Sequence, residues 1–156
     1  MGAKLLAAEV SIVIVVSEFN QPIIENLIQG ALNAFIHHGG EKSCVSIHRV
    51  PGAFEIPGTI QQIMKFNNPH AIVALGAVIR GETPHFDYIA GESAKGIAEI
   101  SRSSNIPIIN GILTTDNVKQ AEDRSQMDGR NKGWDAMEAA LQTITVYQEI
   151  FSAAKC

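Results

Sequence analysis

The sequence predicts an α/β protein in which helices cover both faces of a parallel sheet. Four short runs rich in valine and isoleucine alternate with longer segments whose apolar residues recur at helical spacing. Strands that alternate with helices are joined by right-handed crossovers, which make neighbouring strands parallel. The four runs are almost continuously apolar rather than alternating, as expected for strands that are buried on both sides.

The expected elements follow one another along the chain. In the first helix, apolar residues recur at every fourth position from Ile23 to Phe35 and form one broad stripe. Because the chain has no internal repeat, no low-complexity segment and no long linker, we expect residues 1–156 to form a single domain. The predicted strands are residues 10–17, 44–50, 71–79 and 106–113, and the predicted helices are residues 22–38, 53–66, 86–101, 116–126 and 133–151.

Composition and charge exclude several classes of protein. The chain is 46% hydrophobic and 18% charged, which excludes a disordered protein. Its net charge is −4 and no cluster of Lys and Arg exceeds two residues, so we expect no nucleic-acid partner. Cys44, in a predicted strand, and Cys156 do not form a disulfide framework, which indicates a reducing compartment. No pair of histidines has metal-ligand spacing with a third ligand, so we expect no metal site.

Residues 1–16 superficially resemble a signal peptide, because they combine one lysine with a short apolar run. Glu9 interrupts this run, and the residues after it are those of a buried strand. The run is also far shorter than the roughly 20 residues that span a bilayer. Gly2 fits the start of a myristoylation motif, but Leu6 stands where that motif requires Ser or Thr. We therefore expect a cytoplasmic protein without a membrane anchor.

Parallel α/β sheets bind ligands beyond the carboxyl ends of their strands, and four loops of this chain lie there: residues 18–22, 51–57, 80–85 and 114–117. In the third loop, Thr83 fits the N-cap of a helix and Pro84 its first position. Free N–H groups and the positive end of the helix dipole would then face the crevice and suit a phosphate. An ordinary capped helix start is an equally good interpretation. The nucleotide-binding patterns GxxxxGK[ST] and GxGxxG are absent, which counts against nucleotide binding.

His85 is the expected second residue of that helix and the candidate for proton transfer. The helix dipole opposes a positive charge on its ring, whereas Glu82 and Asp87 favour one, and this balance suits general acid–base catalysis. The alternative is a capping or surface histidine. The remaining histidines are weaker candidates, because they lie at an expected helix end or stand alone: His37, His38, His48 and His70.

Five further residues each have a functional and a structural interpretation. Phe19, at the end of a strand, can stack on a flat heterocycle or pack in the core, while Asn20 fits a helix N-cap. Glu55 stands on a stiff turn between two prolines, where it can accept hydrogen bonds from substrate hydroxyls or simply be solvated. Arg124, in the predicted helix 116–126, can clamp a phosphate, and Lys132 can reach into a site, although both can be surface charges.

Taken together, these segments resemble the lumazine synthase family, which acts in the penultimate step of riboflavin synthesis. The matching stretches occur in order over nearly the whole chain, and the ordered set is far more specific than any one member. They are residues 19–20, 50–57, 76–88, 91–97, 111–116, 124 and 131–133. The resemblance implies a three-layer, flavodoxin-like α/β/α subunit with a four-stranded parallel sheet, assembled as a homopentamer or a multiple of pentamers.

The resemblance also implies a reaction without cofactor or metal. The amine of 5-amino-6-ribitylaminouracil condenses with the ketone of 3,4-dihydroxy-2-butanone 4-phosphate, phosphate is lost, and the ring closes to 6,7-dimethyl-8-ribityllumazine. His85 corresponds to the proton-transfer residue, and Arg124 and Lys132 correspond to residues that a neighbouring subunit contributes. The implied substrate-contacting positions are Phe19, Asn20, Ala53, Phe54, Glu55, Val78, Ile79, Gly81, Glu82, Thr83, Asn110, Arg124 and Lys132.

Three positions depart from the family pattern. Asn110 stands where many members have a phenylalanine that closes the pocket, and Asp128 stands where a lysine often supports the phosphate site. Arg130 is a candidate to compensate for that lysine. The linker of residues 126–130 differs from the one associated with sixty-subunit shells, which favours a plain pentamer or decamer. Two other functions remain alternatives: a carrier of flavin or lumazine, and a shell-forming subunit that has lost catalysis.

Overall fold

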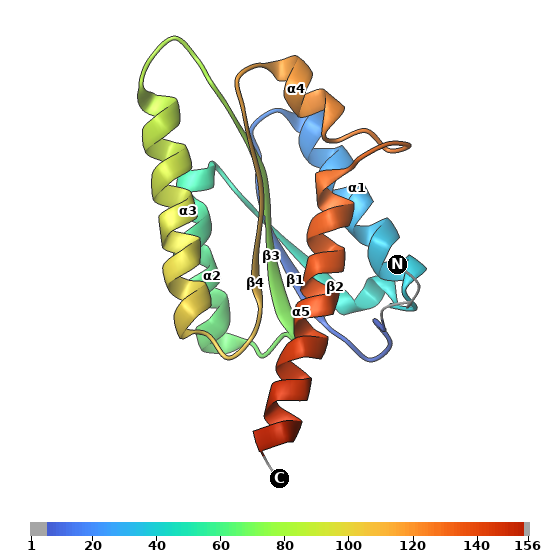
Figure 1. The fold of residues 1–156 in the computed structure, drawn as a ribbon. Helices are drawn as coiled ribbons and strands as arrows, with labels where there is room; N and C mark the ends of the chain where they lie inside the picture. Colours follow the sequence, from blue (N-terminus) through green and yellow to red (C-terminus); the bar gives the residue numbers. More distant parts are fainter. Residues whose placement is uncertain (1–5, 155–156) are drawn as a thin grey trace.

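The computed structural model describes residues 6–154, which form three layers with the sheet in the middle (Figure 1). The strands β1 (Ile12–Ser17), β2 (Val45–Val50), β3 (Ala71–Ile79) and β4 (Ile108–Thr115) are all parallel and lie in the order β2-β1-β3-β4. Helices α2 (Ile56–Phe66) and α3 (His85–Ser103) cover one face of the sheet. Helices α1 (Gln21–His37), α4 (Val118–Asp123) and α5 (Lys132–Ala154) lie on the other. This arrangement confirms the predicted fold class.

Side chains of the central strands alternate between two apolar cores. In β1, Ile12, Ile14 and Val16 pack with α1 and α5, whereas Val13 and Val15 pack with α2 and α3. Every residue of β1 is buried, which explains why its sequence is a continuous apolar run without polar alternation. The central position of β1 and β3 therefore accounts for the pattern from which the parallel sheet was predicted.

Several predicted boundaries are wrong by a few residues. Cys44 ends a short 3-10 turn, η1 (Lys42–Cys44), so β2 begins one residue later than expected. Residues 53–55 form a second such turn, η2 (Ala53–Glu55), ahead of α2. The expected helix 116–126 is only α4, because the Asn117 side chain accepts a hydrogen bond from the Gln120 N–H (2.9 Å) and starts the helix there. Arg124 follows α4 as its C-cap rather than standing inside a helix.

Some expectations concern residues that the structure does not describe, namely Gly2 and Cys156. Within residues 6–154, no helix is long and apolar enough to cross a membrane. In the same range, no group of three or more His, Cys, Asp and Glu side chains is placed to hold a metal ion.

Asn131 fixes the connection between α4 and α5. Residues Ser125 and Asn131 form an antiparallel bridge that folds this connection back on itself. The buried Asn131 amide donates to the carbonyls of Asn26 and Ser125 (both 3.1 Å), and its Oδ1 accepts from the Trp134 N–H (3.0 Å). A single side chain thus joins the start of α5 to α1 and to the end of α4, which makes the connection rigid at both ends.

Gly133 is the point of closest approach between α5 and α1. A Cβ added there would collide with the backbone carbonyl of Leu27 and approach Oδ1 of Asn131 to 3.0 Å. Neither neighbour is a flexible side-chain end that can turn aside. Glycine is therefore required at this position for the two helices to pack.

Gly133→Ala should lower the free energy of unfolding by about 2–3 kcal/mol, because backbone must move to admit the methyl group. Gly58→Ala, in α2, is the matched control, since a Cβ there meets no atom within 4 Å. The control should be neutral or slightly stabilising. Denaturant titration measures both variants, and equal stabilities would contradict this account of the α1–α5 contact.

Candidate active site

A cavity of about 550 Å³ opens at the carboxyl edge of the sheet. It lies between the loop after β1, the turn that connects β2 to α2, the end of β3 and the first turns of α3. The residues that line it are Phe19, Pro51, Gly52, Ala53, Phe54, Glu55, Ala77, Val78, Ile79, Gly81, Thr83, His85, Phe86, Tyr88 and Ile89. Segments far apart in the sequence meet here because parallel strands end at the same edge.

Backbone hydrogen bonds prolong the sheet into these loops. The Glu18 N–H donates to the Val50 carbonyl (2.9 Å), one step beyond the last paired residues of β1 and β2. Likewise the Arg80 N–H donates to the Thr115 carbonyl (2.9 Å) beyond the end of β3. The loops that carry Phe19 and the residues after Ile79 therefore leave the sheet from fixed positions.

The walls of the cavity are aromatic and its base is aliphatic. Ala53 and Val78 are buried, whereas Phe19, Phe54 and Tyr88 are 58%, 48% and 58% exposed. The Phe54 and Tyr88 rings stack, with centroids 6.1 Å apart and planes inclined by 17°. Large rings that remain exposed around a concavity leave apolar area for a ligand to bury, and a flat heterocycle matches their shape.

His85 borders the cavity, but the helix start around it differs from the prediction. α3 begins at His85, Pro84 occupies the cap position, and the Thr83 side chain makes no capping hydrogen bond. The turn is closed instead by the Pro84 carbonyl, which accepts from the Asp87 N–H (3.1 Å). The prediction that Thr83 caps this helix is therefore wrong, and His85 is its first residue rather than its second. The imidazole remains exposed beside the cavity.

Nine of the expected site residues line the cavity, and the other five do not. The nine that line the cavity are Phe19, Ala53, Phe54, Glu55, Val78, Ile79, Gly81, Thr83 and His85. Asn20 and Glu82 lie next to lining residues in the chain without lining the cavity themselves. Asn20 takes the N-cap position of α1 with a left-handed backbone (φ 68°) and no side-chain capping bond.

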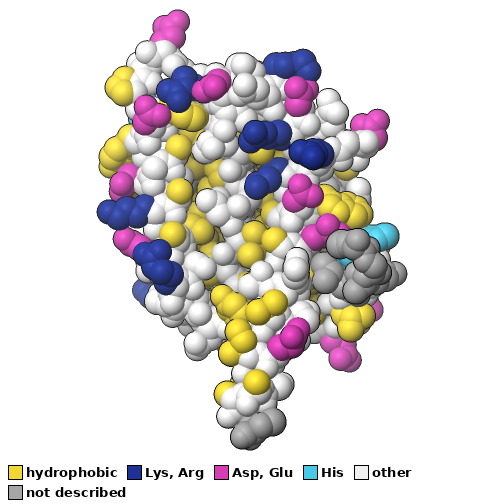
Figure 2. Space-filling model, viewed as in Figure 1, with side chains coloured by type: hydrophobic (Ala, Val, Ile, Leu, Met, Phe, Trp, Pro, Cys, Tyr) yellow, Lys and Arg dark blue, Asp and Glu magenta, His cyan; other side chains and the backbone are white. Residues whose placement is uncertain are grey.

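Arg124, Lys132 and Asn110 are elsewhere. The Lys132 N–H donates to the Arg124 carbonyl (2.8 Å), so the backbones of these two residues meet where α4 ends and α5 begins. Asn110 is exposed on β4, where its Oδ1 accepts from the Ile112 N–H (3.1 Å). Figure 2 shows Lys and Arg side chains gathered towards the end of the molecule where α4 lies, and hydrophobic ones towards the C-terminal end of α5.

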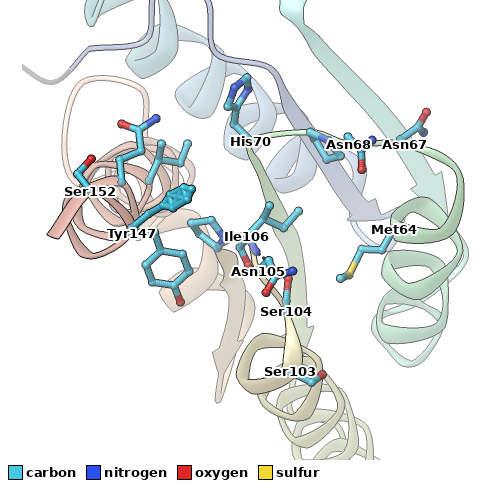
Figure 3. Close-up of a pocket in the computed structure, with 15 residues that line it drawn as sticks. Met64, Asn67, Asn68, His70, Ser103, Ser104, Asn105, Ile106, Tyr147 and Ser152 are labelled. Carbon is cyan, nitrogen blue, oxygen red and sulfur yellow. Dashed lines mark hydrogen bonds between the residues drawn. The ribbon is translucent and has the colours of Figure 1, made fainter. Parts of the chain in front are cut away.

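A larger cavity, of about 880 Å³, opens at the opposite edge of the sheet (Figure 3). It is lined by the end of α3, the start of β3 and the side of α5, including Ser103, His70 and Tyr147. The His70 Nδ1 accepts a hydrogen bond from the Ser11 N–H (3.0 Å), so its ring holds the entry to β1. We assign the active site to the smaller cavity, because ligands of parallel sheets bind at the carboxyl edge.

Over residues 9–148, the chain matches the family of 6,7-dimethyl-8-ribityllumazine synthases. The chain belongs to this family. Among its relatives, the 6,7-dimethyl-8-ribityllumazine synthase of Chlorobium limicola is 40% identical over 146 residues, or 94% of each chain. That of Nitratidesulfovibrio vulgaris is 44% identical over 88% of each chain, and that of Pelodictyon phaeoclathratiforme is 39% identical over 94% of each.

Within this family fold, two residues that sequence reasoning missed stand out. Tyr88 adds a ring to a cavity wall that also includes Phe19, Phe54 and Phe86, and Arg80 lies directly between two expected site residues, Ile79 and Gly81. The signal for Arg80 was available, since a charged residue immediately after a buried strand is uncommon without a partner. Its partners are distant in sequence, however, and only the fold brings them close.

Proposed function

We propose that this chain condenses 5-amino-6-ribitylaminouracil with 3,4-dihydroxy-2-butanone 4-phosphate to form 6,7-dimethyl-8-ribityllumazine. The observation that carries the proposal is the cavity in which three half-exposed aromatic rings lie beside His85. Family membership supports the same reaction. The activity belongs to the biosynthesis of riboflavin, as its penultimate step, and we propose that it takes place in the cytoplasm.

The two substrates bring their own nucleophile and electrophile. The amine attacks the ketone carbon, and water leaves as the imine forms. Loss of a proton from the adjacent carbon leaves an enol and expels phosphate, which keeps the electrons of the broken C–O bond. The enol rearranges to a ketone, the second nitrogen attacks this carbonyl carbon, and a second water leaves as the ring closes. The protein has to orient two molecules, move protons and hold the leaving group, which requires neither cofactor nor metal.

Each lining residue has a role that follows from its position. The Phe19 ring, exposed at the end of β1, stacks on the pyrimidine, while Ala53, Phe54, Val78 and Ile79 bury the rest of the heterocycle. The carboxylate of Glu55 accepts hydrogen bonds from ribityl hydroxyls, and the resemblance gives Asn20 the same ribityl chain to contact. His85 takes a proton from the attacking amine and returns it to the hydroxyl that leaves as water, and it then takes the proton from the adjacent carbon as phosphate leaves.

The phosphate requires positive charge that this cavity lacks. Gly81, Glu82 and Thr83 form the loop beside the phosphate, but among the described residues that line the cavity none is Lys or Arg. Arg124 ends α4 and Lys132 begins α5, and neither lines the cavity of its own subunit. We therefore propose that they complete the site of a neighbouring copy in a homopentamer, with Arg130 replacing the lysine lost at Asp128 and Asn110 facing the heterocycle.

Mixing both substrates with the protein and following lumazine absorbance tests the proposed reaction. The rate of lumazine formation should rise in proportion to the concentration of protein. A carrier would bind the product but leave the rate at that of the uncatalysed reaction, and a purely structural shell subunit would do neither. Either of those results would contradict the proposal.

Variants at His85 and Arg124 should separate proton transfer from phosphate binding. His85→Ala should lower kcat by about two to four orders of magnitude while the KM for the butanone phosphate changes little. Arg124→Ala should instead raise that KM about 30-fold or more, because a charge-assisted contact is lost. His48→Ala and Arg102→Ala, both at exposed positions outside the cavity, are the controls. If both active-site variants had the kcat and KM of the controls, the roles assigned to His85 and Arg124 would be wrong, even if the protein catalysed the proposed reaction.

A further inference from the structure

The loop between β3 and α3, residues 81–84, has few contacts of its own although it borders the cavity. All four of its residues are exposed, and a Cβ at Gly81 would meet no atom within 4 Å. In the described part of the chain, no hydrogen bond involves Gly81, Glu82 or Thr83. The shape of this loop is therefore determined by how its two ends are held.

Arg80 lies at the first end of the loop, directly after β3, and its side chain contacts the second end, at the start of α3. Its guanidinium Nε donates to Oδ1 of Asp116 (3.0 Å), and Nη1 lies 3.6 Å from Oδ1 of Asp87. The same guanidinium lies 4.5 Å from the centre of the Phe86 ring. With the Thr115 hydrogen bond of its backbone, Arg80 joins the end of β3 to the end of β4 and to the first turn of α3.

We propose that Arg80 is a positioning residue for this active site. By contacting Phe86 and Asp87, which directly follow His85, it sets the distance between the two ends of the loop and thereby the place of the imidazole. By contacting Asp116, it anchors that turn of α3 to the edge strand β4. The inference rests on the proposed function, since the loop and His85 are taken to contact the phosphate and the reacting amine.

The contacts of Arg80 point to an indirect role rather than to phosphate binding. Its Nε and Nη1 face carboxylates, its flat face lies against Phe86, and it does not line the cavity. Its side chain is 48% exposed, so the ion pairs contribute little to global stability. Loss of Arg80 should therefore leave the protein folded and appear in the placement of reacting groups, where small displacements have large kinetic effects.

Steady-state kinetics of Arg80→Ala, Arg80→Lys and Asp116→Asn test the proposal. Arg80→Ala should lower kcat and raise the KM for the butanone phosphate, reducing kcat/KM by about tenfold to a hundredfold with an unchanged Tm. Arg80→Lys should recover only part of this, because an ammonium lacks the planar face and the spaced donors that serve Phe86 and two carboxylates. In the double variant Arg80→Ala, Asp116→Asn, the fold reduction in kcat/KM should be smaller than the product of the two single reductions, since both changes remove the same contact.

Arg49→Ala is the matched control. Arg49 donates two hydrogen bonds to Glu25 (2.7 and 3.3 Å), which lower the pKa of that carboxyl, and it is exposed to a similar degree away from the cavity. This variant should keep the parent kcat/KM. The proposal is overturned if Arg80→Ala keeps the kcat/KM of the control. It is also overturned if the fold reductions in kcat/KM of Arg80→Ala and Asp116→Asn multiply in the double variant, as direct contact of Arg80 with the ligand would require.

Hydrogen exchange separates failure of this inference from failure of the proposed function. The Asp87 and Tyr88 amides, which donate to the Pro84 carbonyl, should exchange faster in Arg80→Ala than in the parent, while those of α5 should be unchanged. This readout does not depend on turnover. An inactive parent with faster exchange in the variant would refute the proposed reaction alone, whereas unchanged exchange of the Asp87 and Tyr88 amides would refute the role of Arg80.

Discussion

The parallel direction of the four strands is the constraint on which the rest of the structure depends. Because β1, β2 and β3 end at the same edge, Phe19, the turn before α2 and His85 meet around one cavity although they are spread over much of the chain. The strands can run in this way only because helices bury both faces, and the apolar runs in the sequence reflect that double burial. The packing that buries both faces of the sheet therefore also decides which residues meet at the cavity.

The sequence predicted most of the fold, since strand burial and helix amphipathicity are local patterns. It failed where a boundary depends on one side chain or one turn. Asn117 starts α4 later than expected, and the Pro84 carbonyl, not the Thr83 hydroxyl, closes the first turn of α3. Phe19 and His85 were singled out because they belong to segments that follow parallel strands, and both line the cavity. Arg80 was missed because its partner Asp116 is 36 residues away and adjacent only in the folded sheet.

The chain has an apolar, aromatic cavity and, on a different surface, cationic residues, and we propose that the two belong to one shared site. The described lining of the cavity includes neither Lys nor Arg. At the α4–α5 connection, Asn131 and the closely packed Gly133 fix the backbone where Lys132 bonds to Arg124. In the proposed reaction a dianionic leaving group needs positive charge as well as the apolar cavity. The proposed assembly of several copies brings the two surfaces together.

Complementation between inactive variants tests this division most directly. His85→Ala and Arg124→Ala subunits are unfolded together, refolded as mixed assemblies and compared with each variant refolded alone. If each site takes His85 from one copy and Arg124 from its neighbour, a random mixture should recover about a quarter of the parent activity, the fraction of interfaces that pair two intact halves. Activity no higher than the average of the two variants would contradict a shared site.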